Sequence, residues 1–299
     1  FPWSHDLATS SGAWHGGRTA LPGVTNPHRP SLSPRRIRKR KKQSMKPEMF
    51  SIHAEVESRH WWFAARRRIL FPLIRQVMAD QGGDLVIDVG CGTGGTIAAL
   101  CGEYDCLGID DSEVAIETAQ AVYPQGRFRH GCMPDDLRDV APRTGLYLLM
   151  DVLEHVEDDH AFLSDLISLA RSSAHILITV PACPELWSRH DVTAGHLRRY
   201  DPDSFTSLWR DHDATPRLVT FFNSRLYPLI RLARFVANRF GASCGREGSD
   251  FHVPPFPVNA LFEGIFAGEG KHVQACLDRP EVSAYGCGVS LLALIQCGN

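Results

Sequence analysis

The chain lacks regularly spaced cysteines and long apolar runs. Its nine cysteines are scattered over 299 residues without a C-x-x-C pair. Zinc sites and disulfide frameworks need regular cysteine spacing, so these residues indicate reduced thiols in a cytosolic protein. No apolar stretch approaches the roughly 18 residues that suggest a membrane span, and no apolar segment typical of a secretory leader opens the chain. We therefore expect a cytoplasmic protein.

Acidic and basic residues are unevenly distributed. Residues 1–47 contain ten Lys and Arg but one acid, Asp6, and the rest of the chain has 22 basic against 33 acidic side chains. An acidic body of this kind argues against a nucleic-acid-binding surface. Residues 1–44 are rich in Ser, Pro, Gly and Arg, so we expect a disordered basic segment ahead of one domain at 45–299. This segment has three alternative interpretations. It could bind an anionic partner, it could serve as a targeting segment, or it could lie upstream of a native start at Met45 and not belong to the native protein.

From Met45 onward, short aliphatic runs alternate with helical patterns. Strands are expected at 84–90, 106–110, 127–132, 145–152, 174–182 and 286–297, and helices at 94–101, 112–123, 159–172 and 201–212. Strands that alternate with helices at this spacing indicate a parallel, doubly wound α/β sheet. Ligands of such sheets bind at the carboxyl ends of the strands.

A glycine-rich stretch, Asp-Val-Gly-Cys-Gly-Thr-Gly-Gly, begins at Asp88, where the first strand ends. Its glycines permit a tight turn and the close approach of a ligand to the backbone. The spacing of Gly90, Gly92 and Gly95 also fits the dinucleotide pattern, with Asp110 placed for ribose hydroxyls, so a nicotinamide-dependent oxidoreductase is one alternative. Asp88 favours a ligand other than a dinucleotide. A carboxylate at this position can bind an amino group, whereas its negative charge would not stabilise a pyrophosphate.

Three motifs together resemble the class I S-adenosylmethionine-dependent methyltransferases over residues 48–292. They are D-V-G-C-G-T-G from Asp88, G-I-D at 108–110, and M-D-V-L-E-H-V-E-D-D at 150–159. The resemblance implies a doubly wound, mostly parallel, seven-stranded Rossmann-like sheet with helices on both faces and an antiparallel last strand. H-W-W-F and H-x-R-R-Y motifs look like a bacterial branch often found beside glycan-assembly enzymes. The implied acceptor is a small molecule, a glycan or a lipid-linked compound, with a non-catalytic cofactor-binding protein as an alternative.

The resemblance also implies which residues bind S-adenosyl-L-methionine. By position they are Asp88, Gly90, Cys91, Gly92, Thr93, Gly94, Asp110, Cys132, Met133 and Asp151. Asp110 would bind the ribose, and Cys132 and Met133 would lie beside the adenine. The family commonly has an acid where Cys132 stands, so we expect Asp135 or the backbone to replace it. Gly145 also departs from the family pattern, which has Asp at the start of the fourth strand, and the usual glycine pair before the fifth strand is absent.

A dense polar cluster follows the fifth strand at 186–201, and we expect it to bind the acceptor. His190 or His196 would deprotonate an attacking hydroxyl, with Asp191 orienting one of them. Arg198 or Arg199 would bind a phosphate or carboxylate, and Tyr200 belongs to the same cluster. The substrate-binding candidates in this cluster are Asp191, Arg198, Arg199 and Tyr200. A metal site from His190, Asp191 and His196 lacks a diagnostic spacing, so we expect no metal.

Two polar residues follow the fourth strand. His155 is a third candidate base, because its unperturbed pKa lies near neutrality. A structural role in the turn is the alternative for His155. For Glu154 we favour the structural role, in which hydrogen bonds and the helix dipole hold the first turn.

Aromatic and basic residues are adjacent in the stretch E-S-R-H-W-W-F-A-A-R-R-R-I-L. We expect a lid helix at about 48–80 in which Trp61 and Trp62 exclude water and contact the acceptor. Arg66 would face inward to an acidic partner or an anionic substrate, while Arg67 and Arg68 stay solvated. Ordinary packing of an amphipathic helix is the alternative.

Residues 223–240 form an inserted amphipathic helix with an apolar stripe and four arginines. Basic amphipathic helices can lie on anionic membranes, which would suit a lipid-linked acceptor and place the protein at the inner face of the membrane. Packing of this helix on its own domain is the favoured alternative.

Overall fold

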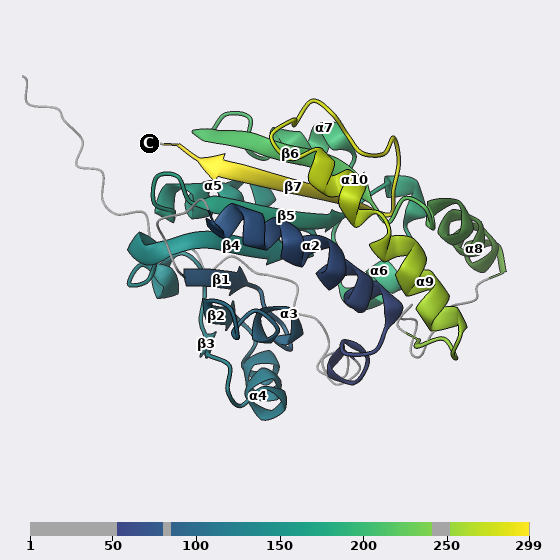
Figure 1. The fold of residues 1–299 in the computed structure, drawn as a ribbon, viewed down its shortest axis with the longest axis horizontal. Coiled ribbons are helices and arrows are strands. Elements are labelled where there is room, and N and C mark those ends of the chain that lie inside the picture. The colour runs from purple at the N-terminus through teal and green to yellow at the C-terminus, as the bar shows by residue number, and fades with distance from the viewer. Residues whose placement is uncertain (1–52, 80–84, 241–251, 299) are drawn as a thin grey trace, which may run out of the picture. The chain divides into compact units, whose positions relative to one another are not determined.

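The computed structural model describes residues 53–79, 85–240 and 252–298, so the basic segment 1–44 lies outside the described residues. The strands are β1 (Leu85–Val89), β2 (Asp105–Asp110), β3 (Phe128–His130), β4 (Thr144–Met150), β5 (His175–Pro181), β6 (Ala214–Phe222) and β7 (Ser290–Cys297). They form one sheet in the order β3-β2-β1-β4-β5-β7-β6 (Figure 1). β7 runs antiparallel to both β5 and β6, whereas the other neighbouring pairs are parallel. The predicted fold class is confirmed.

Helices join and cover these strands. They are α2 (Trp61–Ala79), α3 (Gly95–Ala98), α4 (Glu113–Val122), α5 (Asp159–Leu169), α6 (Arg189–Ala194), α7 (Pro202–Ser207), α8 (Tyr227–Phe240), α9 (Val258–Ala267) and α10 (Gly270–Ala275). α4 and α7 begin where polar side chains cap them, because Ser112 and Asp201 each accept a hydrogen bond from a backbone N–H of the first turn. None of the helices in the described residues is long and apolar enough to cross a membrane.

Two predicted helices are shorter than expected. The helix expected at 94–101 is reduced to the four residues of α3. The helix expected at 201–212 ends at Ser207, and the Trp209 side chain that follows it is buried in the core. Burial of the Trp209 ring explains the early end of α7, because it outweighs the continuation of a short helix.

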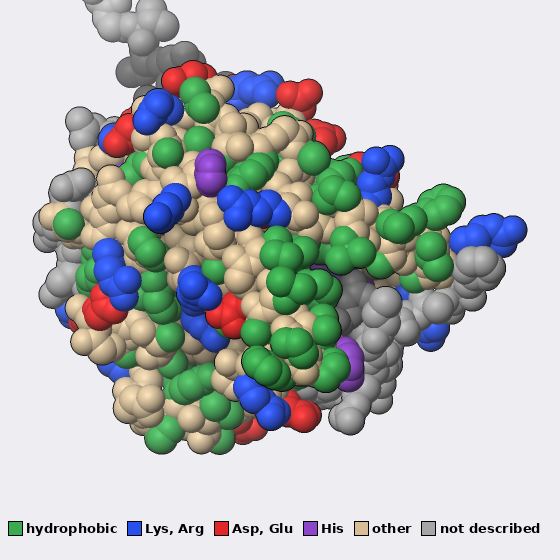
Figure 2. Space-filling model, turned by 45° about the vertical axis from the view of Figure 1, so that its right-hand side comes forward, with side chains coloured by type: hydrophobic (Ala, Val, Ile, Leu, Met, Phe, Trp, Pro, Cys, Tyr) green, Lys and Arg blue, Asp and Glu red, His purple; other side chains and the backbone are tan. Residues whose placement is uncertain are grey.

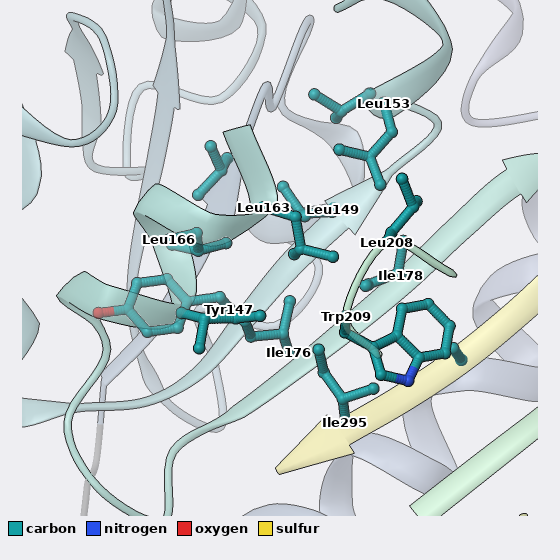
Figure 3. Close-up of a cluster of buried hydrophobic side chains, with 14 of the residues drawn as sticks. Tyr147, Leu149, Leu153, Leu163, Leu166, Ile176, Ile178, Leu208, Trp209 and Ile295 are labelled. Atoms are coloured by element: carbon teal, nitrogen blue, oxygen red, sulfur yellow. The ribbon is translucent and has the colours of Figure 1, made fainter. Parts of the chain in front are cut away.

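One core lies on the face of the sheet that carries α5 and α7. Tyr147 and Leu149 of β4 point to this face, and Leu163 and Leu166 of α5 pack over them (Figure 3). Trp209 closes the same cluster next to Ile295 of β7 (Figure 3). The central strands are buried on both faces, which explains why their sequences are continuous apolar runs and not alternating ones.

The second core lies under α2, which crosses the opposite face of the sheet beside α9 and α10 (Figure 1). Ile69, Leu73 and Ile74 of α2 are almost completely buried there. The predicted lid of about 48–80 therefore has a second half that is part of the core. Movement of the segment, which stays a prediction, would be confined to residues 53–63.

Hydrogen exchange distinguishes these two parts of the segment. We expect residues 65–78 to be protected with or without S-adenosylhomocysteine, because elements with many buried contacts open rarely. Residues 53–63 should exchange more slowly once this ligand is added, because a lid is ordered by what it covers. Mass-spectrometric exchange on the free and bound protein measures both. Protection of 53–63 that is already high in the free protein and unchanged by the ligand would identify the whole segment as static core.

Candidate active site

The glycine-rich loop turns sharply at the carboxyl end of β1. The backbone N–H groups of Gly90 and Cys91 both donate to the carbonyl of Ile109 at 2.8 and 3.0 Å, which ties the loop to β2. Gly90 has a φ of +79°, and a Cβ there would lie 2.8 Å from Val152 Cγ2. Gly92 also has a positive φ, but a Cβ on it would meet open space. The loop therefore leaves bare backbone beside an open volume, as a bound ligand requires.

Two acids flank this loop with different partners. Asp110 is satisfied by the protein, since its two oxygens accept hydrogen bonds from the N–H groups of Gly92 at 3.0 Å and Ser112 at 2.9 Å. Asp88 is 2% exposed, and its Oδ1 has no hydrogen-bond partner in the described part of the chain. Burial raises the pKa of Asp88 to about 7, although the charge of Arg66 acts to lower it. A buried carboxyl oxygen without a partner fits the amino group of a bound ligand.

Arg66 faces inward from α2, as predicted. Its Nη1 lies 2.6 Å from Asp151 Oδ2, and its guanidinium carbon is 4.4 Å from the centre of the Trp62 ring. Asp151 is thus the acidic partner named in one of the two alternatives for Arg66, whereas contact with an anionic substrate stays a prediction. Arg68 is exposed, also as predicted, whereas Arg67 is half-buried and donates to the carbonyl of Glu57.

Glu57 is a site residue that the sequence analysis missed. It is buried, and its Oε2 accepts a hydrogen bond of 2.7 Å from the hydroxyl of Thr93 in the glycine-rich loop. A Cβ on Gly95 would lie 2.3 Å from the carboxyl carbon of Glu57, so the absent side chain makes room for this contact. No sequence signal marked Glu57, because the contact joins segments 36 residues apart.

Three histidines meet on the other side of the site. His155 lies in the turn Leu153–His155 after β4, and its ring centre is 4.9 Å from that of His196. The rings of His190 and His196 are 6.0 Å apart. Burial lowers the pKa of His190 well below its usual value, and His196 and Arg234 act in the same direction. His190 is therefore neutral at physiological pH, as a general base must be.

Asp191 holds this cluster together. It is fully buried, and its Oδ1 lies 2.9 Å from His196 Nδ1 and 2.8 Å from Arg199 Nε. Its other oxygen accepts from the backbone N–H of Ser188 in the capping box that starts α6. Burial alone would raise the pKa of Asp191, but the hydrogen bond with His196 and the charge of Arg199 hold it well below its usual range. Through its contact with Nδ1, Asp191 orients the His196 ring, as expected.

A cavity of about 550 Å³ connects the glycine-rich loop with the histidine cluster. Its lining includes Trp61, Trp62, Arg66, Asp88, Gly90, Cys91, Gly92, Thr93, Asp151, His155, His190, His196 and Arg199 among the predicted residues. The structure also adds unpredicted lining residues, which include Glu57, Thr96, Glu154, Phe262 and Arg234. Arg234 was visible as one arginine of the predicted amphipathic helix, but its position 3.7 Å from Asp191 was not.

Other predicted residues do not line this cavity. Arg198 Nη1 lies 2.7 Å from Asp159 Oδ2, and the Tyr200 hydroxyl donates to the same oxygen at 2.7 Å. Both side chains thus bond to Asp159 and do not face the cavity, which corrects their predicted role in acceptor binding. The reason is local geometry, because Tyr200 forms a β-bridge with Ala182 and neighbouring side chains along an extended segment point to opposite sides.

The predicted adenine turn also lies outside the cavity lining. Cys132 is exposed and its N–H donates to Asp136 Oδ2 at 2.7 Å, while Met133 packs against the core. Asp135, which we expected to supply the missing acid, pairs with Arg138 instead. Asp136, and not Asp135, is therefore the acid that contacts Cys132 in this turn. Gly94 likewise faces protein, since a Cβ on it would lie 2.5 Å from the Phe128 ring.

Comparison with known proteins identifies the family. A profile described as a methyltransferase domain matches residues 62–218, which is more than half of the chain. The chain belongs to this methyltransferase family. The predicted resemblance to the S-adenosylmethionine-dependent class is confirmed, whereas the narrower bacterial branch stays a prediction.

Individual relatives are more distant. A ubiquinone biosynthesis O-methyltransferase of Neisseria meningitidis serogroup C is 29% identical over 150 residues, which cover 47% of this chain and 62% of that protein. The match thus spans less than two thirds of the relative. The plantazolicin methyltransferase BamL, solved with a triazolic desmethylPZN analog and SAH, has a TM-score of 0.51 at 15% identity, covering 85% of this chain and 92% of that one. This likeness supports the fold.

Asp88 provides a direct test of the cofactor half of this methyltransferase site. We expect S-adenosylhomocysteine to release close to one proton on binding at pH 6, because a cationic amino group favours the carboxylate of a group whose pKa is about 7. The released fraction should fall toward zero at pH 8, where Asp88 is already ionised, and affinity should weaken as the pH drops below about 7.

Calorimetry in buffers of different ionisation enthalpy measures this proton. The Asp88→Asn variant should bind without proton release at either pH. Proton release that persists in Asp88→Asn would assign the titrating group elsewhere.

Proposed function

We propose that the protein transfers the methyl group of S-adenosyl-L-methionine to a hydroxyl of a small acceptor with an apolar part, most simply a lipid-linked compound. The observation that carries this proposal is a single cavity that is lined both by the predicted cofactor-binding residues and by the three candidate bases. Asp88 and the loop at 90–93 line one side of it, and the three histidines line the other. Such a cavity brings a cofactor and an acceptor together without an intervening barrier.

The residues fit a direct displacement. The acceptor oxygen would attack the methyl carbon and form the new C–O bond while the C–S bond breaks and sulfur keeps the electron pair. The hydroxyl proton would pass to a neutral imidazole, and His190 is the candidate because it lines the cavity and burial keeps its ring uncharged. Asp88 would hold the cofactor's amino group, and Trp62, stacked on Arg66, would exclude water from the reacting atoms.

Apolar side chains support an amphipathic acceptor. Trp61 stacks edge-on against Phe262 of α9 with ring centres 5.7 Å apart, and both line the cavity. Leu229 and Ile230 of α8 line it as well. The curated relative is named for O-methylation in ubiquinone biosynthesis, which supports oxygen as the acceptor atom. A non-catalytic binding protein on this fold is the second candidate, and turnover decides between the two.

Turnover with labelled S-adenosylmethionine tests the proposal. Purified protein should methylate a component of a lipid or quinone-precursor fraction, and His190→Ala should lower the rate by about 100-fold or more while S-adenosylhomocysteine affinity stays within about twofold. His160→Ala is the matched control, because His160 is exposed on α5 outside the cavity lining. Lost cofactor affinity in His190→Ala would mean that this histidine is structural. Absence of transfer to every lipid, glycan and quinone-precursor fraction would favour the non-catalytic candidate.

The outer surface of α8 supports a contact with a membrane. Leu232 and Phe235 are 60% and 70% exposed, and Arg231 and Arg239 lie exposed on the same helix. Figure 2 shows hydrophobic side chains gathered on the face that carries α8 and α9, with basic side chains beside them. We propose that this face meets an anionic lipid surface and delivers a lipid-linked acceptor to the cavity.

Sedimentation with vesicles tests this contact. Full-length protein should co-sediment with vesicles that contain phosphatidylglycerol, and Phe235→Ser should weaken binding by about tenfold, because a buried aromatic ring contributes roughly 1.5–3 kcal/mol. Val122→Ser on α4 removes an apolar side chain that is 45% exposed elsewhere on the surface and should have no effect. Equal binding of both variants would place the membrane contact outside α8.

A further inference from the structure

One cluster inside the cavity has a chemistry that methyl transfer alone does not require. Glu154, His155 and His196 each present one ligand-type atom within 4.8 Å of those of the other two. Glu154 and His155 come from the turn after β4, and His196 follows α6. All three residues line the cavity.

Glu154 is the most informative member of this cluster. Its side chain is 0% exposed, and neither carboxylate oxygen has a hydrogen-bond partner in the described residues. The expectation that hydrogen bonds of Glu154 hold the turn is therefore wrong. Burial raises the pKa of Glu154 well above its usual value, and the nearby Asp151 acts in the same direction. An unpartnered buried acid is costly unless a proton or a cation neutralises it.

His196 is oriented as metal-binding histidines are. Its Nδ1 lies 2.9 Å from Asp191 Oδ1, which leaves Nε2 as the free ligand atom of the ring. A carboxylate on the far nitrogen fixes the orientation of the ring and makes the other nitrogen a better ligand. Arg199 and Ser188 in turn hold Asp191 in place. The His196 ring is thus held in a fixed orientation by Asp191 and the partners of Asp191.

We propose that Glu154, His155 and His196 bind one divalent transition-metal cation. One carboxylate and two imidazoles form a ligand set that zinc takes in catalytic sites with an open position, and that other first-row divalent cations also take. Bonds of about 2.1 Å put neighbouring ligand atoms roughly 3–4 Å apart, so the three side chains need to close by about 1 Å.

This site differs from the one that the sequence analysis considered and set aside. That trio was His190, Asp191 and His196, but Asp191 is fully buried and already bonded to Arg199 and Ser188. The role of the cation rests on the proposed function. An acceptor hydroxyl in the open coordination position would lose its proton more readily, since a bound metal lowers the pKa of a ligating oxygen.

Manganese and cobalt binding test the site directly. Full-length protein, stripped with a chelator and saturated with S-adenosylhomocysteine, is titrated with Mn²⁺ and followed by electron paramagnetic resonance. We expect one equivalent to bind, and Glu154→Gln and His196→Ala each to weaken binding by about 100-fold or more. Co²⁺ should give a visible spectrum without a thiolate charge-transfer band, which distinguishes this site from the free cysteines.

Matched measurements keep the outcomes distinct. His160→Gln alters an exposed histidine five residues from His155 and should bind Mn²⁺ as the wild type does. Glu154→Gln keeps the shape of a neutral carboxyl, so its S-adenosylhomocysteine affinity and thermal unfolding should match the wild type. Failure of the wild type to bind either cation at millimolar concentration, or equal binding by Glu154→Gln and wild type, would overturn the metal site. Failure to bind S-adenosylhomocysteine would instead overturn the proposed function.

Discussion

The ion pair between Arg66 and Asp151 connects the parts of this site. It joins α2 to the residue that follows β4, and the same guanidinium carries the Trp62 ring on its face. The Arg66 side chain is 7% exposed and that of Asp151 is 24% exposed, so the pair is only partly accessible to water and salt. A buried pair of this kind is costly to break, because either partner alone would be an uncompensated charge. The pair therefore fixes the aromatic wall over the cavity floor, and the charge of Arg66 also acts on Asp88.

The buried acids at this site are neutralised in two different ways. Asp191 is surrounded by cations and donors, so the pKa of its carboxyl is held low and it remains an anion that orients His196. Within the described residues, Asp88 and Glu154 each have a carboxyl oxygen without a hydrogen-bond partner, and burial raises the pKa of both. Different environments give carboxyl groups different tasks. The paired acid positions other residues, whereas the unpaired acids are available to ligands.

Local patterns accounted for much of the fold and part of the site. The strand runs, the caps at Ser112 and Asp201, and the tight turn at Gly90 follow from burial and backbone sterics of neighbouring residues. Arg198 and Tyr200 show where reasoning from local patterns failed. Both belong to the predicted polar cluster, but the extended backbone at this point directs them to Asp159 on one side. Spacing in the sequence shows that polar residues gather, and the conformation of the segment decides which of them face the ligand.

Long-range packing decided the rest. The sequence by itself determined that an acid and a histidine follow β4, and that a polar segment follows β5, because hydrophobic patterning places strand ends without knowledge of their neighbours. Only the tertiary structure decided that the Glu154 carboxyl lies beside His196 with no hydrogen-bond partner from the described part of the chain, and that Glu57 contacts Thr93. The physical reason is that hydrogen-bond partners and burial depend on which side chains the sheet brings together. Residues far apart in the chain leave no periodic signal of that meeting.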